Sequence, residues 1–378
     1  MVEIQWIVLF ADFIVTLCTI LNSLVFGRIG RTKIAKMSNS AHQPLSVIVT
    51  AHNQAEELRK HLPSLLLQNY PKNFEVIVVD MASDDETLPL LEKMEEEYPM
   101  LRHTFTPVSA RDISMERLAL TLGIRSASYE WVILLHAGCR PTSPYWLRRM
   151  SDAIHSKDDA KIVVAPVSPC LSDWKKEYTF LWNEMLWLSF AAKHGAYRTG
   201  QCNVAYNQNH FMQHNGFASH AQLACGAIDI MVNRNSTSQN TVAAIRPESV
   251  VLCPPIQNEY NADVMYMETR RHLTRHRYYR LQYALAVSIL PFALLAGIST
   301  IAWLGFSTEW GLLAIPVCLM LLQWSVYHRN FSKSMRFLGL QPLSPFSHIY
   351  ALFIPWNDFV AWVRHKMTGK KMFRKKFI

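Results

Sequence analysis

The chain has 378 residues, a formal net charge of +9 and a composition that is 50% hydrophobic, which suffices for one large folded domain and several membrane segments. Its basic residues gather beside apolar segments, at residues 28–36, 270–280, 329–336 and 364–376, so we expect lipid headgroups and no nucleic acid as the anionic partner. The seven cysteines are scattered without a CxxC pair, which signals neither a zinc site nor a disulfide framework.

The first predicted element is an apolar run over residues 4–26, which is long enough to cross a bilayer. It lacks the basic start and the clear cleavage site of a signal peptide, so we expect an uncleaved anchor over residues 1–27. The basic linker that follows, residues 28–43, is then cytoplasmic. Asp12 lies inside the anchor, where an acid is either a functional group or a side chain that reaches the headgroups near the outer end.

Apolar strand patterns alternate with amphipathic helix patterns in the middle of the chain. The expected strands cover residues 45–50, 74–80, 132–135 and 161–165, and the expected helices cover residues 55–68, 84–97 and 114–126. This alternation predicts an α/β domain over residues 44–265, built on a parallel, right-handed, doubly wound sheet. In such a sheet the ligand crevice lies beyond the carboxyl ends of the strands.

Two more apolar groups, residues 281–306 and 310–327, are joined by Ser307-Thr308-Glu309 without Lys or Arg. They predict a hairpin through the membrane, and their basic flanks place both of its ends in the cytoplasm. The expected segments here are a basic juxtamembrane segment (266–280), the hairpin (281–328) and a basic carboxyl-terminal segment (329–378).

A last apolar patch over residues 346–363 is interrupted by Pro355, Asn357 and Asp358. A fourth crossing at this patch would place the basic tail outside, against the usual distribution of positive charge. We therefore expect a helix that lies in the membrane interface. The chain then crosses the membrane three times and its middle domain is cytoplasmic.

The strand ends carry motifs that resemble a known family. These motifs are PLSVIVTAHNQAEELRKHLPSLLLQNYP, FEVIVVDMASDDET, LALTLGIRSASYEWVILLHAGCRPTSPYWL, GQCNVAYNQNHFMQHNGF and GAIDIMVN. In order and spacing they resemble a membrane-anchored bacterial glycosyltransferase of family 2, whose α/β fold is the GT-A type. The resemblance implies transfer of a sugar from a nucleotide-diphosphate sugar to an acceptor hydroxyl, with inversion at the anomeric carbon.

The resemblance implies a nucleotide-binding cradle at the ends of the first two strands, formed by Thr50, Ala51, Asn53 and Asp80. Arg117, in the predicted helix over residues 114–126, is a further nucleotide-binding candidate. For two of them a structural role is the alternative to nucleotide contact. Asn53 is able to cap the helix that begins at Ala55, and Asp80 is able to cap the turn formed by residues 83–86. The family often has a second acid and a Glu at the positions held here by Met81 and Gln54, so recognition of the base is altered.

The donor diphosphate in this family is neutralised by Mg or Mn on an Asp-x-Asp motif, which aligns with His136-Ala137-Gly138. Hard cations prefer carboxylate oxygens, and neither carboxylate is present, so the ligands of the expected metal are not evident. Arginine forks are an alternative way to neutralise the phosphates. The candidates are Arg117, Arg125, Arg140 and the pair Arg270-Arg271.

The catalytic base that the resemblance implies is Asp229, in the segment GAID, although a helix-capping role is the alternative. Gly200 and Asn203 stand where the family contacts the acceptor. The segment Glu268-Thr269-Arg270-Arg271-His272 replaces a motif that carries a Trp in enzymes that make long chains, which favours addition of a single sugar. Lipid headgroup contact is the alternative role of these basic residues.

Three functions remain open from the sequence. The first is a glycosyltransferase of the bacterial inner membrane that adds one sugar, from the cytoplasmic side, to a lipid-linked or cell-surface glycan acceptor. The second is a catalytically inactive relative that binds nucleotide sugar, glycan or a partner in a glycan-synthesis complex. The third is a purely structural membrane protein, and the polar residues retained at the strand ends argue against it.

Overall fold

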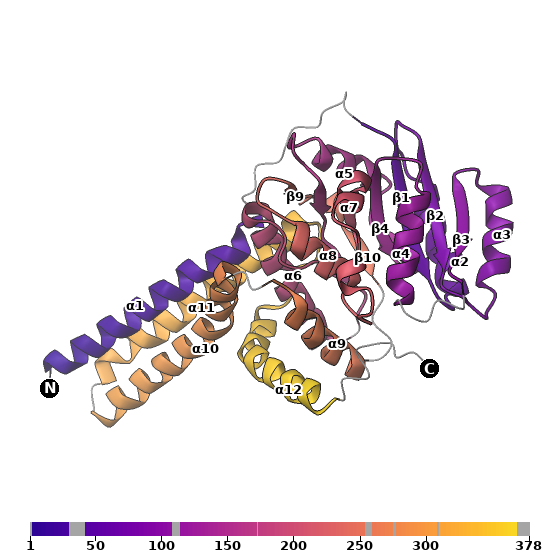
Figure 1. The fold of residues 1–378 in the computed structure, drawn as a ribbon. Coiled ribbons are helices and arrows are strands. Elements are labelled where there is room, and N and C mark those ends of the chain that lie inside the picture. Colours follow the sequence, from indigo (N-terminus) through magenta and orange to yellow (C-terminus); the bar gives the residue numbers. More distant parts are fainter. Residues whose placement is uncertain are drawn as a thin grey trace. The chain divides into compact units, whose positions relative to one another are not determined.

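A computed structural model describes residues 2–29, 42–107, 114–171, 173–253, 259–274, 277–307 and 310–368 (Figure 1). The chain forms two compact units. Unit 1 consists of Met1–Thr32, Asp173–Ser189 and Arg275–Phe359, and unit 2 consists of Lys33–Ser172, Phe190–Thr274 and Val360–Ile378. The boundaries expected for the α/β domain, residues 44–265, differ from this division because Asp173–Ser189 groups with the long apolar helices.

Unit 2 is built on a seven-stranded sheet in the order β3-β2-β1-β4-β8-β6-β9 (Figure 1). Its strands are β1 Leu45–Ala51, β2 Phe74–Asp80, β3 Leu101–Phe105, β4 Trp131–His136, β6 Ile162–Val164, β8 Val204–Asn207 and β9 Thr241–Ala243. β1 is buried along its whole length, and β2 and β4 are buried except at one end, because their β-branched and aliphatic residues face neighbours on both sides of the sheet.

The sheet is mostly parallel, which confirms the predicted α/β class. β1, β2, β3 and β4 all run in one direction. β8 runs antiparallel to both β4 and β6, so the sheet is mixed but mostly parallel, as predicted. The direction of a strand is set by the route of the connecting chain, which the four residues of β8 do not encode.

A second, three-stranded sheet has the order β5-β10-β7. Its strands are β5 Arg140–Pro141, β10 Val251–Cys253 and β7 Val167–Pro169. Cα pairing of Val251 with Pro141 and with Val167 brings the segment that follows β4 beside two segments from late in the domain.

The helices that lie wholly within unit 2 are α2 Ala55–Leu66, α3 Thr87–Glu97, α4 Met115–Ser126, α5 Trp146–Ile154, α7 Gln208–Gln213, η2 Ala218–His220, α8 Ala227–Asn235, η3 Pro247–Ser249 and α9 Glu259–His272. Of these, α2, α4 and α8 bear on the site. The structure places α2, α3 and α4 within three residues of their expected bounds, because a buried apolar stripe marks each of them.

Unit 1 contains the long apolar helices α1 Val2–Gly27, α10 Arg277–Phe306 and α11 Ala314–Phe337, which lie side by side in Figure 1. Among the described residues, three helices are long and apolar enough to cross a membrane, over Ile4–Gly27, Arg277–Phe306 and Trp310–Phe337. The three predicted apolar spans are therefore present as helices. Also in this unit are the first part of α6 Trp174–His194, η4 Trp310–Leu312, η5 Pro345–Phe353 and the start of α12 Ile354–Met367.

Polar contacts join the helices of unit 1. Asn330 Nδ2 donates to Ser23 Oγ over 2.8 Å, and Trp182 Nε1 donates to Tyr327 OH over 2.9 Å. Asp12 is only 4% exposed. Its carboxylate is therefore covered by protein atoms, and both of its possible roles, a functional group or a side chain that reaches the headgroups, stay predictions.

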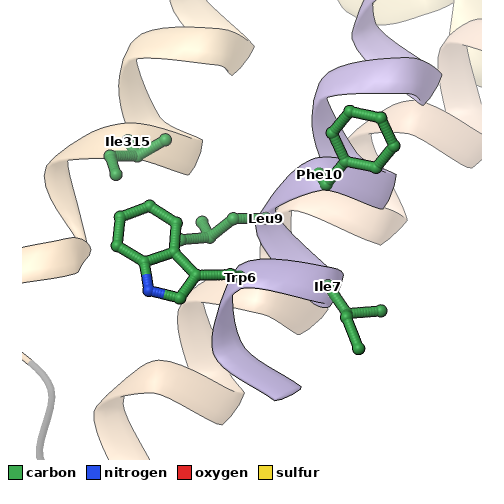
Figure 2. Close-up of a pocket in the computed structure, with 5 residues that line it drawn as sticks. All are labelled: Trp6, Ile7, Leu9, Phe10 and Ile315. Carbon is green, nitrogen blue, oxygen red and sulfur yellow. The ribbon is translucent and has the colours of Figure 1, made fainter. Parts of the chain in front are cut away.

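The outer surface of unit 1 is apolar. Between α1 and α11 lies a hollow of about 620 Å³ lined by Trp6, Ile7, Leu9, Phe10 and Ile315 (Figure 2). η5 and the start of α12 expose the aromatic residues Phe346, Phe353, Trp356 and Phe359. These two helices cover the predicted interfacial patch, and its position in a membrane stays a prediction.

Several basic residues that set the predicted orientation lie outside the described residues. They are those within residues 30–41, 275–276 and 369–378. Thr308 and Glu309, in the predicted hairpin loop, also lie outside them.

Candidate functional site

Three neighbouring parallel strands of unit 2 carry expected site residues at the same edge of the sheet. The register pairs Ala51 at the end of β1 with Asp80 at the end of β2, and Thr50 with His136 at the end of β4. The carboxyl ends of parallel strands form the usual ligand crevice of an α/β sheet. The structure therefore brings together four of the residues expected in the site, as the strand assignments predicted.

Asn53 joins the loops that follow β1 and β2. Its Nδ2 donates to Asp84 Oδ1 over 2.5 Å, and its Oδ1 accepts from the Asp84 backbone N–H over 2.9 Å. The Ala55 N–H, at the start of α2, donates instead to Asp85 Oδ2 over 3.2 Å. The capping role considered for Asn53 is therefore wrong, and its exposed amide lies in a polar loop at the mouth of the site.

Asp80 is 4% exposed, and its carboxylate is used within its own turn. Its two oxygens accept from the Ser83 backbone N–H over 3.3 and 3.2 Å, and the Ser83 hydroxyl also donates to it. The local role considered for Asp80 is therefore present in the structure. Contact with a nucleotide stays a prediction, and Ser83 is the group that would share this carboxylate with a ligand.

His136 occupies the position where a metal-binding carboxylate was expected. Its Nε2 lies 2.9 Å from the Gln201 backbone oxygen and its Nδ1 lies 3.1 Å from Thr50 Oγ1. A carbonyl oxygen only accepts, so we assign the proton of the neutral ring to Nε2 and let Nδ1 accept from the Thr50 hydroxyl. Both ring nitrogens are thereby occupied by protein groups.

The expected hard cation does not fit this segment. Gly138 has a φ of +83° and no side chain, and Ala137 is buried. Mg²⁺ and Mn²⁺ take oxygen ligands, chiefly carboxylates, and the tripeptide 136–138 supplies none. The segment 136–138 therefore offers no ligand of the kind that the expected cation prefers.

Asn203 is completely buried, and its amide is fully used. Its Oδ1 accepts from Trp146 Nε1 over 3.0 Å, and its Nδ2 donates to the backbone oxygens of Pro166 and Ser249 over 2.7 and 2.9 Å. The sugar contact expected of this residue would require these bonds to break. In the structure Asn203 holds the loop that carries Gly200 and Gln201 instead.

Asp229, the expected base, lies in the first turn of α8 and is completely buried. One carboxylate oxygen accepts from the backbone N–H and the hydroxyl of Thr199, each over 2.9 Å. The other oxygen forms an ion pair with Arg198 Nε over 2.7 Å, and the guanidinium of Arg198 lies over the ring of Tyr266. Asp229 therefore anchors the segment that leads to Gly200, beyond the capping role first considered.

Arg117 is a buried cation in α4 that holds a distant loop. Its guanidinium donates to the backbone oxygens of Leu223 and Cys225, the latter over 2.6 Å. Burial lowers the pKa of Arg117 below its usual value. A side chain enclosed in this way does not reach a nucleotide, so the nucleotide contact expected of Arg117 finds no support in its geometry.

Arg270 and Arg271, the other phosphate candidates, lie in the last turn of α9. Arg271 is exposed and its guanidinium lies 3.9 Å from Glu268, whose carboxylate also contacts His272 at 3.0 Å and His365 at 2.6 Å. Burial raises the pKa of Glu268, but the hydrogen bonds from the two histidines outweigh it and leave the pKa below its usual value. Arg270 is half-buried.

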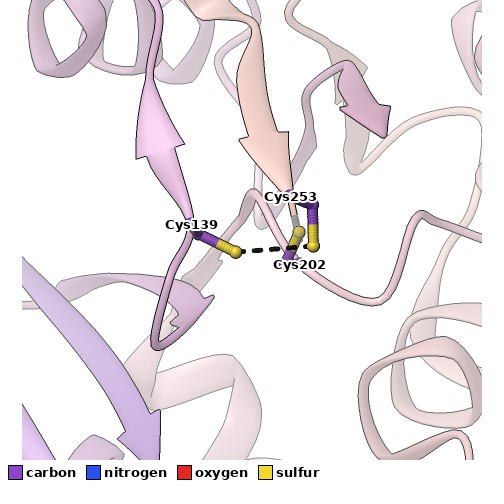
Figure 3. Close-up of side chains that lie close together, drawn as sticks. All are labelled: Cys139, Cys202 and Cys253. Atoms are coloured by element: carbon purple, nitrogen blue, oxygen red, sulfur yellow. Dashed lines mark hydrogen bonds between the residues drawn. The ribbon is translucent and has the colours of Figure 1, made fainter. Parts of the chain in front are cut away.

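Sequence reasoning missed one cluster near this edge of the sheet. The sulfur atoms of Cys139, Cys202 and Cys253 lie within 4.8 Å of one another (Figure 3). These cysteines are far apart in the chain, so no spacing motif marks them. The available signal was their position, since Cys139 follows β4, Cys202 adjoins the loop residue Gln201, and Cys253 ends β10.

Comparison with known proteins gives a family match over the strands that form the site. Residues 46–213 match the family described as Glycosyl transferase family 2. A stretch of 56 residues is 43% identical to the uncharacterized glycosyltransferase YfnE of Bacillus subtilis (strain 168). That stretch covers 15% of this chain and only 14% of the length of the relative.

Solved structures give a likeness in fold. The mannosyltransferase PcManGT from Pyrobaculum calidifontis, solved with GDP-Man and Mn²⁺, is similar at a TM-score of 0.52 and 17% identity, over 88% of this chain and 98% of that one. Residues 1–349 of TarS from S. aureus, solved with UDP-GlcNAc, give a TM-score of 0.44 and 14% identity, over 86% of this chain and 91% of that one. At these identities the likeness to PcManGT concerns the fold alone.

Proposed function

Residues 46–213 belong to glycosyl transferase family 2, and from this premise we propose that the protein is a membrane-bound glycosyltransferase. It moves a single sugar, with inversion, from a nucleotide-diphosphate sugar to a lipid-linked or cell-surface glycan acceptor. The observation that carries the proposal is the row of polar residues at the adjacent ends of β1, β2 and β4 in a GT-A fold.

The loops after β1 and β2 supply the proposed nucleotide site. Asn53 and Asp84 hold each other in an exposed pair beside the buried carboxylate of Asp80. Fixed amide and carboxylate groups are suited to the donors of a base and the hydroxyls of a ribose. Thr50 and Ala51 bring the backbone of β1 to the same edge.

The departing diphosphate needs positive charge, which arginine provides in this proposal. Arg140 is exposed in β5, four residues after His136. Its planar guanidinium is able to bind phosphate oxygens at two points. Arg271 is a second exposed candidate, whereas the enclosed guanidinium of Arg117 stays with the protein.

The acceptor hydroxyl must lose its proton as it attacks the anomeric carbon, and Asp229 is the proposed base. For this step one oxygen of Asp229 has to exchange Arg198 or Thr199 for the acceptor hydroxyl. When Thr199 is the group exchanged, Arg198 at 2.7 Å still holds the other oxygen while the carboxylate accepts the proton of the hydroxyl.

The burial of Asp229 favours a second function, which is binding of the donor sugar without catalysis. Asp229 is completely buried with both oxygens occupied, and the segment 136–138 holds no carboxylate. A protein that binds the donor sugar and a partner, without turnover, would retain the nucleotide loops and need neither group. The experiment below separates this function from the transferase.

We place the protein in the bacterial inner membrane, where it crosses three times with the catalytic domain in the cytoplasm. Three apolar helices support the crossings. The apolar hollow lined by Trp6 and Ile315 supports a surface that faces lipid chains (Figure 2). The exposed aromatic residues of η5 and α12 are of the kind that lies at membrane interfaces.

Calorimetric titration of the detergent-purified chain with UDP and GDP, with and without Mn²⁺, tests the donor site. We expect binding of one nucleotide that does not depend on metal. Asp80→Ala should weaken this binding about ten- to a hundredfold, the effect of a lost charge-assisted hydrogen bond. Asp158→Ala is the control, because this exposed acid precedes β6 and lies at the opposite edge of the sheet.

Turnover is measured as release of nucleoside diphosphate from a bound donor sugar when membrane lipid extract is added. The transferase predicts release by the native chain and loss of release, with donor binding retained, in Asp229→Asn. Donor binding without release from any sugar supports the non-catalytic function. Absence of nucleotide binding under every condition contradicts both.

A further inference from the structure

Three thiols from separate parts of unit 2 meet in one place. Cys139 lies in the turn after β4, Cys202 precedes β8 and Cys253 ends β10 (Figure 3). The Sγ atoms of Cys139 and Cys253 are 3.6 Å apart, and all three sulfur atoms lie within 4.8 Å of one another. Cys139 and Cys202 are buried, and Cys253 is partly accessible.

This geometry is close to that of a thiolate-bound metal ion. Zinc binds cysteine sulfur at about 2.3 Å, so two thiolates at a tetrahedral angle lie about 3.8 Å from each other. The 3.6 Å between Cys139 and Cys253 is near this value, and a separation of up to 4.8 Å closes with small side-chain rotations. Among the described residues, no other group of three or more His, Cys, Asp and Glu side chains brings its ligand atoms together closely enough to hold a metal ion.

We propose that Cys139, Cys202 and Cys253 form a binding site for a thiophilic metal ion of the Zn²⁺ class. Soft thiolate ligands select such ions over Mg²⁺ and Mn²⁺. The ion binds as thiols lose their protons to solvent, so that up to three protons are released for each ion bound. Three protein ligands leave one position for water or another ligand.

The site joins segments that border the proposed donor and acceptor sites. Cys139 lies three residues after His136, and Cys202 adjoins Gln201, whose carbonyl oxygen binds His136 Nε2 over 2.9 Å. β10 pairs with β5, which begins directly after Cys139. A bound ion would fix these segments to one another, at the edge of the sheet where the hard cation finds no ligands.

A disulfide is the competing use of the same sulfurs. Cys139 and Cys253 are close enough to be oxidised together, but a disulfide engages two thiols and leaves Cys202 without a role. The proposed cytoplasmic location is reducing, which keeps all three thiols available. Convergence of three sulfurs rather than two therefore favours the metal.

The test is titration of Co²⁺ into the reduced, metal-stripped full chain in detergent, followed by displacement with Zn²⁺. We expect a thiolate-to-cobalt charge-transfer band that saturates at one ion per chain and disappears when Zn²⁺ is added. Zn²⁺ should also protect three thiols from a thiol-reactive reagent under native conditions. The band and the protection should both be lost in Cys202→Ser and in Cys253→Ser.

Two variants serve as matched controls. Cys225→Ser removes a buried thiol and Cys170→Ser removes an exposed thiol, neither of which belongs to the cluster, so both should keep the band. Cys253→Ser decides the result if the variant of the fully buried Cys202 fails to fold. No band in the native chain, a band that survives Cys253→Ser, or a Cys139–Cys253 disulfide in metal-free protein from reducing cells would overturn the proposal.

Discussion

Asn203 carries more of the site's architecture than a substrate contact would require. Its backbone has a φ of +57°, in the left-handed region that residues other than Gly and Asn rarely adopt. Its amide satisfies the indole N–H of Trp146 and two backbone oxygens in a completely buried position. One side chain thus fixes the loop before β8 against α5 and against the segments that precede β7 and β10.

We predict that Asn203→Ala lowers the free energy of unfolding by about 3–5 kcal/mol. The variant leaves Trp146 Nε1 and the Ser249 oxygen without partners, each costing about 1–3 kcal/mol before relaxation, and adds left-handed strain of about 1 kcal/mol. The Pro166 oxygen loses one of two hydrogen bonds, since it also accepts from the Val251 backbone N–H over 3.1 Å. Urea unfolding of the detergent-solubilised chain, followed by tryptophan fluorescence, measures the change.

Asn215→Ala is the control for this prediction. Asn215 also has a left-handed backbone, with a φ of +56°, but its side chain is exposed. Its replacement should therefore cost only the strain of about 1 kcal/mol. Equal losses in the two variants would mean that the buried amide of Asn203 contributes nothing beyond its backbone conformation.

At the scale of elements, α4 packs on β1 and β2 through a glycine. A Cβ atom on Gly123 would lie 2.4 Å from Ile48 Cγ2 and 3.1 Å from Val79 Cγ2. Both neighbours are β-branched and buried in the central strands, so their rotamers have little freedom to move away. The absence of a side chain at position 123 sets how closely the helix approaches the sheet that carries the site.

We predict that Gly123→Ala destabilises the protein by about 1–2 kcal/mol. Alanine gains about 1 kcal/mol of helix propensity, but overpacking a close-packed interface costs typically 1–3 kcal/mol, and a 2.4 Å contact lies at the costly end. The shift in the urea midpoint at constant slope measures this change.

Gly305→Ala in α10 is the matched substitution, since nothing lies within 4 Å of its added methyl group. It should leave stability unchanged or raise it slightly. A Gly123→Ala variant as stable as the native chain would show that Ile48 and Val79 yield more easily than their packing indicates.

The whole molecule combines an α/β unit with an apolar three-helix unit. The helices of unit 1 enclose polar groups such as Asp12 and expose large apolar side chains, which is the reverse of a soluble bundle. This distribution agrees with a protein that is held in a bilayer.

The orientation across the membrane yields a prediction at this scale. Phe306, 90% exposed at the end of α10, should lie outside, and Leu67, 68% exposed after α2, should lie in the cytoplasm. A membrane-impermeant maleimide should label Phe306→Cys in intact cells and label Leu67→Cys only after permeabilisation. The native chain, with exposed Cys18, Cys170 and Cys318, gives the background. Labelling of Leu67→Cys in intact cells would contradict the proposed cytoplasmic location of the α/β unit.

The sequence by itself determined the parts of the fold whose signal is local. β2 begins and ends at its predicted residues, and β1 and β4 lie within one residue of theirs, because a short run of buried apolar residues is its own marker. The three long apolar helices follow from composition alone in the same way. The same strand ends also located Thr50, Asp80 and His136, since the edge of a parallel sheet is fixed once its strands are known.

Tertiary structure decided everything that joins residues distant in the chain. The antiparallel course of β8, the burial of Asn203, the ion pair of Asp229 with Arg198 and the meeting of Cys139, Cys202 and Cys253 leave no periodic trace in the sequence. Each depends on how loops return to the sheet, and many routes are compatible with the same local pattern. Asn203 and Asp229, which the sequence motifs assign to the acceptor and to catalysis, are therefore bound to other groups of the protein in this structure.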